Sequence, residues 1–141
     1  MRTPKTLLIT SLKNAGLRIT APREAICEFL SESAEHPTAA IVYERLLPKF
    51  PSMSLATVYN SLETLTRLGS INAIGDAGDN KGHFDADTSP HIHLACTSCH
   101  TISDLVPTDF ANLVDEINTT GFKPTGVRIV VYGQCPNCSS N

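Results

Sequence analysis

Four cysteines in the second half of the chain form two Cys-x-x-Cys pairs. Cys96 and Cys99 make the first pair, and Cys135 and Cys138 make the second. Such a turn lets two thiolates point at one ion, and two turns supply the four sulfur ligands that tetrahedral zinc prefers. The intervening residues would hold a helix and strands. A structural zinc ion would therefore join the two ends of one small unit and contribute to its folding.

Disulfides and a redox pair fit the cysteine quartet less well than zinc does. Disulfides are uncommon without a secretory signal, and the amino terminus shows neither a long apolar run nor a cleavage site. A redox pair usually follows a strand at the start of a helix and needs no second copy. Cys27 lies beside the apolar face of a predicted helix and is expected to be a small buried side chain.

A second group of candidate ligands consists of histidines and aspartates. Asp85, His91, His93 and Asp104 fall within twenty residues, and the fifth candidate, His36, lies at a helix break before a proline. His91 and His93 alternate, so on a strand both imidazoles would face the same side. Nitrogen and carboxylate ligands together suit iron(II), manganese(II) or zinc. Taken one at a time, each is better explained as a surface residue or a satisfied polar group.

Apolar periodicity and capping residues predict the elements that position these side chains. Helices are predicted at residues 5–15, from 20 onward, at 38–47 and at 54–68, and a hairpin at 71–74 and 83–85. In the fourth helix, Leu55, Val58, Leu62 and Leu65 form one apolar stripe. This order is typical of a winged helix-turn-helix, whose last helix enters the major groove. Any small helical domain also has amphipathic helices, so the pattern alone leaves DNA binding open.

The second half of the chain predicts a smaller unit with both helix and strand. Strands are expected at residues 92–95, 102–106 and 127–132, with a helix at 109–118. A unit of this size, about 50 residues, buries too little surface to be stable alone. It is therefore expected to need a metal ion, a partner subunit, or both.

Charge is distributed unevenly along the chain. The net charge is −3, but residues 1–75 hold eight basic and six acidic side chains, whereas residues 76–141 hold three and eight. This asymmetry suggests two functions in one chain, with nucleic-acid binding in the first half. The alternative is that scattered charges merely solvate a helix. No stretch approaches the roughly 20 apolar residues of a membrane span, so a cytoplasmic protein without membrane association is expected.

The chain resembles the ferric uptake regulator family along nearly its whole length. The motifs that carry the resemblance are GLRIT at 16–20, PR at 22–23, EHPTA at 35–39, SLATVYNSL at 54–62, GD at 75–76, FD at 84–85, HIHLACTSC at 91–99, Asp104, GF at 121–122 and YGQCPNC at 132–138. Within the family the chain is most similar to the peroxide-sensing repressors. Iron-sensing members generally carry Glu where Asp104 stands.

The resemblance implies a metal-dependent repressor with one structural zinc and one regulatory metal per subunit. It makes His36, Asp85, His91, His93 and Asp104 the ligands of regulatory Fe2+ or Mn2+, and the four paired cysteines the ligands of zinc. In the family's peroxide sensors, bound iron(II) reacts with hydrogen peroxide and a ligand histidine is oxidised; the matching positions are His36 and His91. Loss of a ligand would release the metal and then the DNA, so no enzymatic turnover is expected.

The resemblance also implies a set of DNA contacts. Thr57, Tyr59 and Asn60 are expected to face the major groove, and Ser54 to hold a phosphate at the helix start. Arg18 is expected in a narrow, A·T-rich minor groove, and Arg23 at the DNA backbone. Many family members have Arg where Asn60 stands, which changes the expected base preference. His83 and His100 match no family role and are expected at the surface.

The predicted fold class is therefore α+β, with two domains. A winged helix-turn-helix DNA-binding domain is predicted over residues 1–85, a hinge over 86–90, and a small α/β dimerisation domain with the four-cysteine zinc site over 91–141. The implied partners are a second copy of the chain and double-stranded DNA. A symmetric dimer implies a near-palindromic, A·T-rich operator.

Three alternatives remain at this point. The first is an iron- or zinc-responsive repressor of the same family without peroxide sensing. The second is a zinc hydrolase, but catalytic zinc keeps three protein ligands and an open position, whereas five candidates are present here. The third is a zinc-stabilised module that binds only protein, against which the basic first half and the predicted helix at 54–68 argue.

Overall fold

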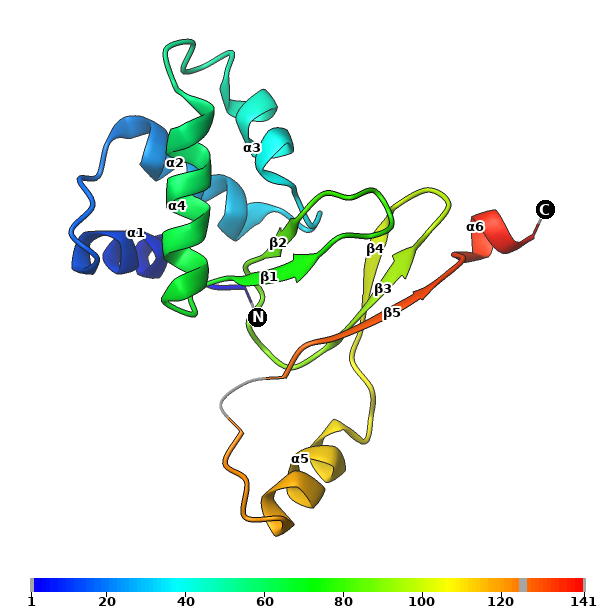
Figure 1. The fold of residues 1–141 in the computed structure, drawn as a ribbon. Coiled ribbons are helices and arrows are strands. Elements are labelled where there is room, and N and C mark those ends of the chain that lie inside the picture. Colours follow the sequence, from blue (N-terminus) through cyan, green and yellow to red (C-terminus); the bar gives the residue numbers. More distant parts are fainter. Residues whose placement is uncertain (1, 125–126, 141) are drawn as a thin grey trace. The chain divides into compact units, whose positions relative to one another are not determined.

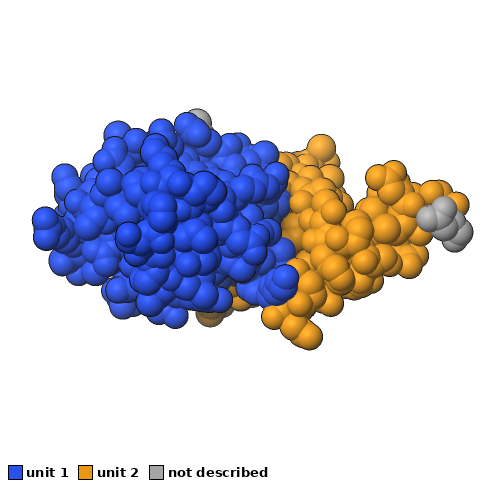
Figure 2. Space-filling model, turned by 90° about the horizontal axis from the view of Figure 1, so that it is seen from above, with its two compact units in different colours: residues 1–76, 81–88 blue, residues 77–80, 89–141 orange. Residues whose placement is uncertain are grey.

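The computed structural model describes residues 2–124 and 127–140, and it divides into two compact units. Unit 1 contains the chain up to Asp76 and the segment Lys81–Thr88 (Figure 2). Unit 2 contains Ala77–Asn80 and the chain from Ser89 onward. Within the described residues, no helix is both long enough and apolar enough to cross a membrane.

Unit 1 consists of four helices followed by a two-stranded hairpin (Figure 1). The elements are α1 Lys5–Asn14, α2 Ala21–Glu32, α3 Ala39–Leu46, α4 Leu55–Arg67, β1 Asn72–Gly75 and β2 His83–Asp85. The strands are antiparallel, with a register shift between Ala73 and Gly75. The mixed helix and strand fold confirms the predicted class.

Hydroxyl side chains begin three of these helices. Thr20, Thr38 and Ser54 are the N-cap residues of α2, α3 and α4, and each accepts a hydrogen bond from the backbone N–H three residues later. Such a bond satisfies one of the donors that a helix start leaves without a partner. After α4 the backbone of Gly69 has φ +73°, which glycine adopts at little cost.

The core of unit 1 forms around α4. Val58, Leu62 and Leu65 are fully buried and pack in one cluster with Leu8 and Leu12 of α1 and with apolar residues of α2 and α3. Leu55 was predicted to share this stripe, but its side chain is 41% exposed. Leu55 is the first residue of α4, and the buried cluster of unit 1 does not extend to this end of the helix. This exposure corrects the predicted stripe and leaves the first turn of α4 at the surface.

Unit 2 contains a three-stranded sheet and two helices. The elements are β3 Ile92–Cys96, β4 Ile102–Leu105, α5 Phe110–Thr119, β5 Ile129–Gly133 and α6 Pro136–Ser139. The strand order is β4-β3-β5, with β3 antiparallel to β4 and parallel to β5. The last strand was predicted at 127–132 but lies two residues later at its start, and the short α6 was not predicted.

Unit 2 leaves much apolar surface uncovered. None of the ten residues of α5 is buried, and in Figure 1 this helix lies away from the sheet. Large apolar side chains that remain exposed in unit 2 are Leu94, Leu105, Val106, Leu113, Phe122, Val131 and Tyr132. Contiguous exposed apolar surface is typical of protein–protein interfaces. These side chains are therefore candidates for contact with another chain.

The packing of α4 yields the first testable prediction. Leu62→Ala should lower the free energy of unfolding by about 2–5 kcal/mol, because it removes a fully buried side chain from the core. Leu68→Ala is the control, since that side chain is 46% exposed, and its effect should stay within about 0.5 kcal/mol. Urea denaturation followed by circular dichroism measures both. Equal unfolding midpoints for the two variants would contradict this account of the core.

Candidate metal centres and nucleic-acid interface

The parallel pairing of β3 with β5 brings the two cysteine pairs together. Cys96 ends β3 and is in register with Gly133, the last residue of β5. The backbone N–H of Thr97 donates to the Gly133 carbonyl at 2.8 Å, which extends the contact beyond the strands. The two cysteine pairs therefore lie at the adjacent ends of these strands, and their four sulfur atoms lie within 4.8 Å of one another.

The dimensions of this cluster fit a zinc ion. A tetrahedron with zinc–sulfur bonds of about 2.3 Å has sulfur atoms about 3.8 Å apart. The Sγ atoms of Cys99 and Cys135 are 3.8 Å apart. All four thiols come from unit 2, so an ion bound here would join the turn after β3 to the segment after β5.

Backbone donors prepare Cys96 to act as a thiolate ligand. The N–H groups of Cys99 and Cys135 point at its Sγ at 3.5 and 3.4 Å, and these bonds lower the pKa of Cys96 to about 5. The three neighbouring sulfurs raise the pKa of Cys138 to about 12, because a further negative charge beside them is unfavourable. A divalent cation would remove that repulsion, and metal binding would then release a proton.

Cys27 has a different environment from the quartet. Its side chain is fully buried in the core of unit 1. Burial raises the pKa of this thiol to about 11, so it stays protonated near neutral pH. Its position agrees with the expected small apolar side chain.

Unit 1 brings together two of the five predicted regulatory ligands. His36 Nε2 lies 3.4 Å from Asp85 Oδ2. The segment between α2 and α3 runs along β2, where the Phe84 N–H donates to the Pro37 carbonyl at 2.9 Å. His83 Nδ1 also lies 2.6 Å from the His36 carbonyl. His83 is buried, which corrects the expected surface position and makes it a support for the His36 backbone.

Unit 2 brings together the other three predicted ligands. His93 pairs with Asp104 across β3 and β4, and the Nε2 atoms of His91 and His93 lie 3.6 and 3.8 Å from Asp104 Oδ1. The imidazole of His91 donates from Nδ1 to the Ser89 carbonyl at 2.7 Å. That bond leaves the lone pair on Nε2, the orientation that metal-binding histidines commonly adopt. Two imidazoles, from β3 and from the residue before it, therefore converge on a carboxylate of β4.

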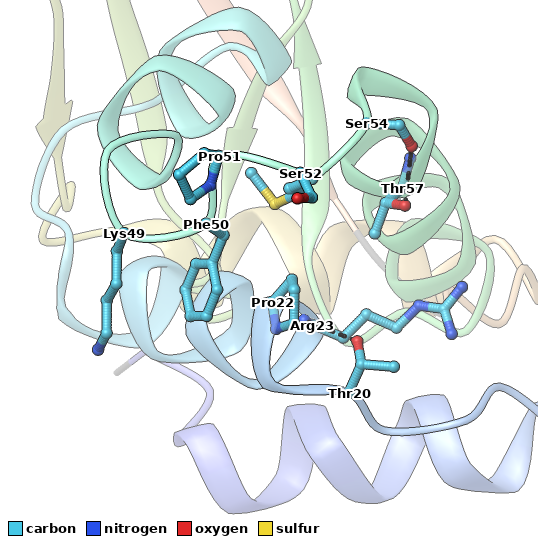
Figure 3. Close-up of a pocket in the computed structure, with 10 residues that line it drawn as sticks. Thr20, Pro22, Arg23, Lys49, Phe50, Pro51, Ser52, Ser54 and Thr57 are labelled. Atoms are coloured by element: carbon cyan, nitrogen blue, oxygen red, sulfur yellow. Dashed lines mark hydrogen bonds between the residues drawn. The ribbon is translucent and has the colours of Figure 1, made fainter.

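A hollow of about 600 Å³ opens beside the start of α4 (Figure 3). Its wall includes Arg23 of α2, Lys49 of the segment between α3 and α4, and Ser54 and Thr57 at the start of α4. The two cations and the positive end of the α4 helix dipole both favour a phosphate group. Lys49 was not among the predicted contacts. In the sequence, Lys49 stands out only as a single lysine between two prolines.

The predicted DNA-contact residues are all in unit 1 and differ in their surroundings. On α4, Tyr59 is 48% exposed, Asn60 is exposed and Thr57 is half-buried. Arg18 is exposed on the segment between α1 and α2. Arg23 donates from Nη1 to the Arg18 carbonyl at 2.7 Å. Arg23 therefore holds the segment that presents Arg18 and is also part of the hollow.

Comparison with known proteins identifies the family of this chain. The model of the ferric uptake regulator family matches residues 14–132. The chain belongs to this family. It is 39% identical to a peroxide-responsive repressor PerR of Staphylococcus saprophyticus, over 92% of this chain and 88% of that protein. It is 40% identical to the peroxide operon regulator of Bacillus subtilis, over 93% and 90%.

Solved structures of family members are similar as well. The ferric uptake regulator Fur of Helicobacter pylori has a TM-score of 0.82 at 19% identity and covers 99% of this chain and 97% of its own, which shows the shared fold. PerR of Streptococcus pyogenes is 33% identical with a TM-score of 0.54, covering 98% and 94%. This ferric uptake regulator family member thus shares its mixed helix and strand fold with solved structures of its relatives.

Removal of one thiol tests the zinc assignment. Cys138→Ser should reduce bound zinc from about one ion per chain to almost none, because zinc prefers four sulfur ligands here. Unit 2 should then unfold, since its sheet has little apolar core. Elemental analysis and near-UV circular dichroism measure the two effects. Cys27→Ala is the matched control and should retain zinc; zinc retained equally in both variants would refute the assignment.

Proposed function

We propose that this chain is a metal-dependent transcriptional repressor that releases DNA when hydrogen peroxide oxidises one of its ligand histidines. The observation that carries the proposal is the convergence of His91 and His93 on the Asp104 carboxylate within unit 2. Relatives at 39% and 40% identity are named peroxide-responsive repressor and peroxide operon regulator. Family members regulate transcription, so the chain is proposed to act in the cytoplasm on DNA and not as an enzyme.

The proposed regulatory ligands are His36, Asp85, His91, His93 and Asp104. The pair from unit 1 and the trio from unit 2 each hold imidazole nitrogen and carboxylate oxygen close together, a donor set suited to iron(II) and manganese(II). Because the ligands come from two units, coordination by all five would favour one relative orientation of the units. Selection of that orientation from the ensemble would couple metal binding to DNA binding.

Peroxide sensing is proposed to depend on His36 and His91. Iron(II), if bound, would supply the redox chemistry that activates the O–O bond of hydrogen peroxide. Overall, one peroxide oxygen would be inserted into a ring C–H bond of either imidazole, and the other oxygen would leave as water. This two-electron oxidation of the histidine would make its nitrogen a poorer ligand. Asp104 has one methylene fewer than the Glu of iron-sensing members and should leave more room for peroxide beside the ligands.

DNA binding is proposed for the exposed side of α4 and the adjoining segment at Arg18. Thr57, Tyr59 and Asn60 would face bases in the major groove, with thymine methyls against Tyr59 and an adenine edge against Asn60. Arg18 would enter a narrow A·T-rich minor groove. Ser54 and Arg23 would hold a backbone phosphate at the hollow, with Arg23 also supporting the Arg18 segment.

A homodimer is proposed from the surface of unit 2. The apolar side chains of α5 and of the sheet lack cover within the described part of the chain, including Leu113, Val131 and Tyr132. A second copy could cover them with the same surface, as in most soluble homodimers. Two α4 helices related by a twofold axis would read a near-palindromic operator.

Mass spectrometry after peroxide treatment tests the sensing step. Protein loaded with iron(II) should gain one oxygen atom at His36 or His91 after a small excess of hydrogen peroxide and should lose operator binding. Protein loaded with manganese(II) should remain unmodified and bound. Asp104→Glu is the matched variant, with the same charge, and should bind DNA with iron(II) yet resist oxidation. Unmodified histidines and retained DNA binding in the wild type would instead indicate an iron- or zinc-responsive repressor without peroxide sensing.

Salt titration of operator binding tests the proposed interface. Arg18→Ala should weaken binding to an A·T-rich operator and reduce the slope of log affinity against log salt by about 1, because one cation–DNA contact is lost. Arg67→Ala removes the same charge from an exposed position at the other end of α4. That control should bind like the wild type. If both variants behave alike, only the overall charge matters and the assignment of Arg18 fails.

A further inference from the structure

The hairpin of unit 1 has a loop that belongs to unit 2. Strands β1 and β2 lie in unit 1, whereas Ala77–Asn80, here called the wing loop, clusters with unit 2. The wing loop lies against the turn formed by residues 96–100, here called the first cysteine turn (Figure 1). A Cβ atom built on Gly78 would lie 3.5 Å from Thr97 Cα and 3.6 Å from His100 Nδ1. The two segments therefore lie so close together that a side chain at Gly78 would touch the first cysteine turn.

His100 connects the first cysteine turn to the wing loop. Its side chain was expected at the surface but is half-buried. Its Nδ1 donates to the Ala77 carbonyl at 3.0 Å, and its backbone N–H donates to the Cys96 carbonyl at 2.8 Å. One residue thus bonds to a cysteine ligand on one side and to the wing loop on the other. Ala77 is fully buried, and its own N–H donates to Asp79 Oδ1 at 3.2 Å, so both backbone polar groups of Ala77 have partners.

The backbone of His100 is in an unusual conformation. It has φ +63°, and within the described residues the other non-glycine residue with positive φ is Asn80 of the wing loop. A histidine in this region is strained and persists only where surrounding contacts hold it. The two non-glycine residues with positive φ therefore lie in the two segments that meet at this contact.

We propose that His100 is a positioning residue for DNA binding, which holds the wing loop against the first cysteine turn and so links the shape of the wing to an intact zinc site. The inference rests on the proposed DNA-binding function, because a wing contacts the DNA backbone beside the recognition helix. The turn that carries His100 begins at Cys96 and contains Cys99. Coordination of these thiolates would hold the turn closed and keep the imidazole within reach of Ala77.

The test compares His100→Gly with His100→Asn. Both residues tolerate positive φ, so neither adds backbone strain. The Asn amide nitrogen is bonded to Cγ, as Nδ1 of histidine is, and can donate to the Ala77 carbonyl from the same place. Glycine has no donor. The pair therefore isolates the hydrogen bond from the conformation of the turn.

Three measurements on full-length, zinc-containing protein with manganese(II) are needed: zinc content, amide hydrogen exchange of residues 77–81, and affinity for an operator duplex. His100→Gly should retain zinc, exchange these amides at least about tenfold faster and bind the operator at least about fivefold more weakly, within the usual range of coupling between sites. His100→Asn should resemble the wild type in all three measurements.

Several outcomes would overturn the proposal. Unchanged exchange in His100→Gly would show that the wing loop does not depend on the imidazole. Faster exchange with unchanged affinity would remove the role in DNA binding, and loss of zinc from His100→Gly would show that His100 supports the cysteine turn instead. Failure of the wild-type protein to bind any operator with metal would refute the proposed function, while the exchange comparison would still test the contact between His100 and Ala77.

Discussion

The parallel pairing of β3 with β5 is the constraint on which unit 2 depends. It places the first cysteine pair beside the second, although 35 residues separate Cys99 from Cys135. The same strand, β3, carries His93 opposite Asp104 of β4. The central strand therefore positions the first cysteine pair at its end and one candidate regulatory ligand, His93, within it. A parallel pair needs a crossover connection, and here the chain passes through α5 between the strands.

In unit 2, metal coordination and association with a second chain take the place of a large apolar core. Its small sheet and uncovered α5 bury little surface within the chain, whereas unit 1 has a continuous core around α4. Metal binding by four thiols and covering of the apolar side chains by a second copy are the two ways in which such a unit reaches stability. In the proposed repressor, structural zinc and dimer formation are then linked, because both stabilise unit 2.

Much of the architecture could be predicted because local signals agreed with the fold. Hydroxyl caps at Thr20, Thr38 and Ser54, the helix break at Pro37 and the apolar spacing of α4 each depend on neighbours within a few residues. Leu55 shows the limit of that reasoning, since periodicity places it on the buried face but the core ends before the first turn of α4. His83 shows another limit: its role arises from the segment 36–38 lying along β2, a contact across 47 residues.

The sequence by itself determined the ligand types, the two Cys-x-x-Cys turns, the helices and the family, because these depend on residue identity and short spacing. Only the tertiary structure decided which groups meet. It placed two of the five candidate ligands together in unit 1 and the other three together in unit 2, set Arg23 against the Arg18 carbonyl, and brought His100 to the Ala77 carbonyl. Most of those contacts join residues far apart in the chain. Strand pairing and side-chain packing, which no local pattern encodes, bring the paired atoms within 3.8 Å of each other.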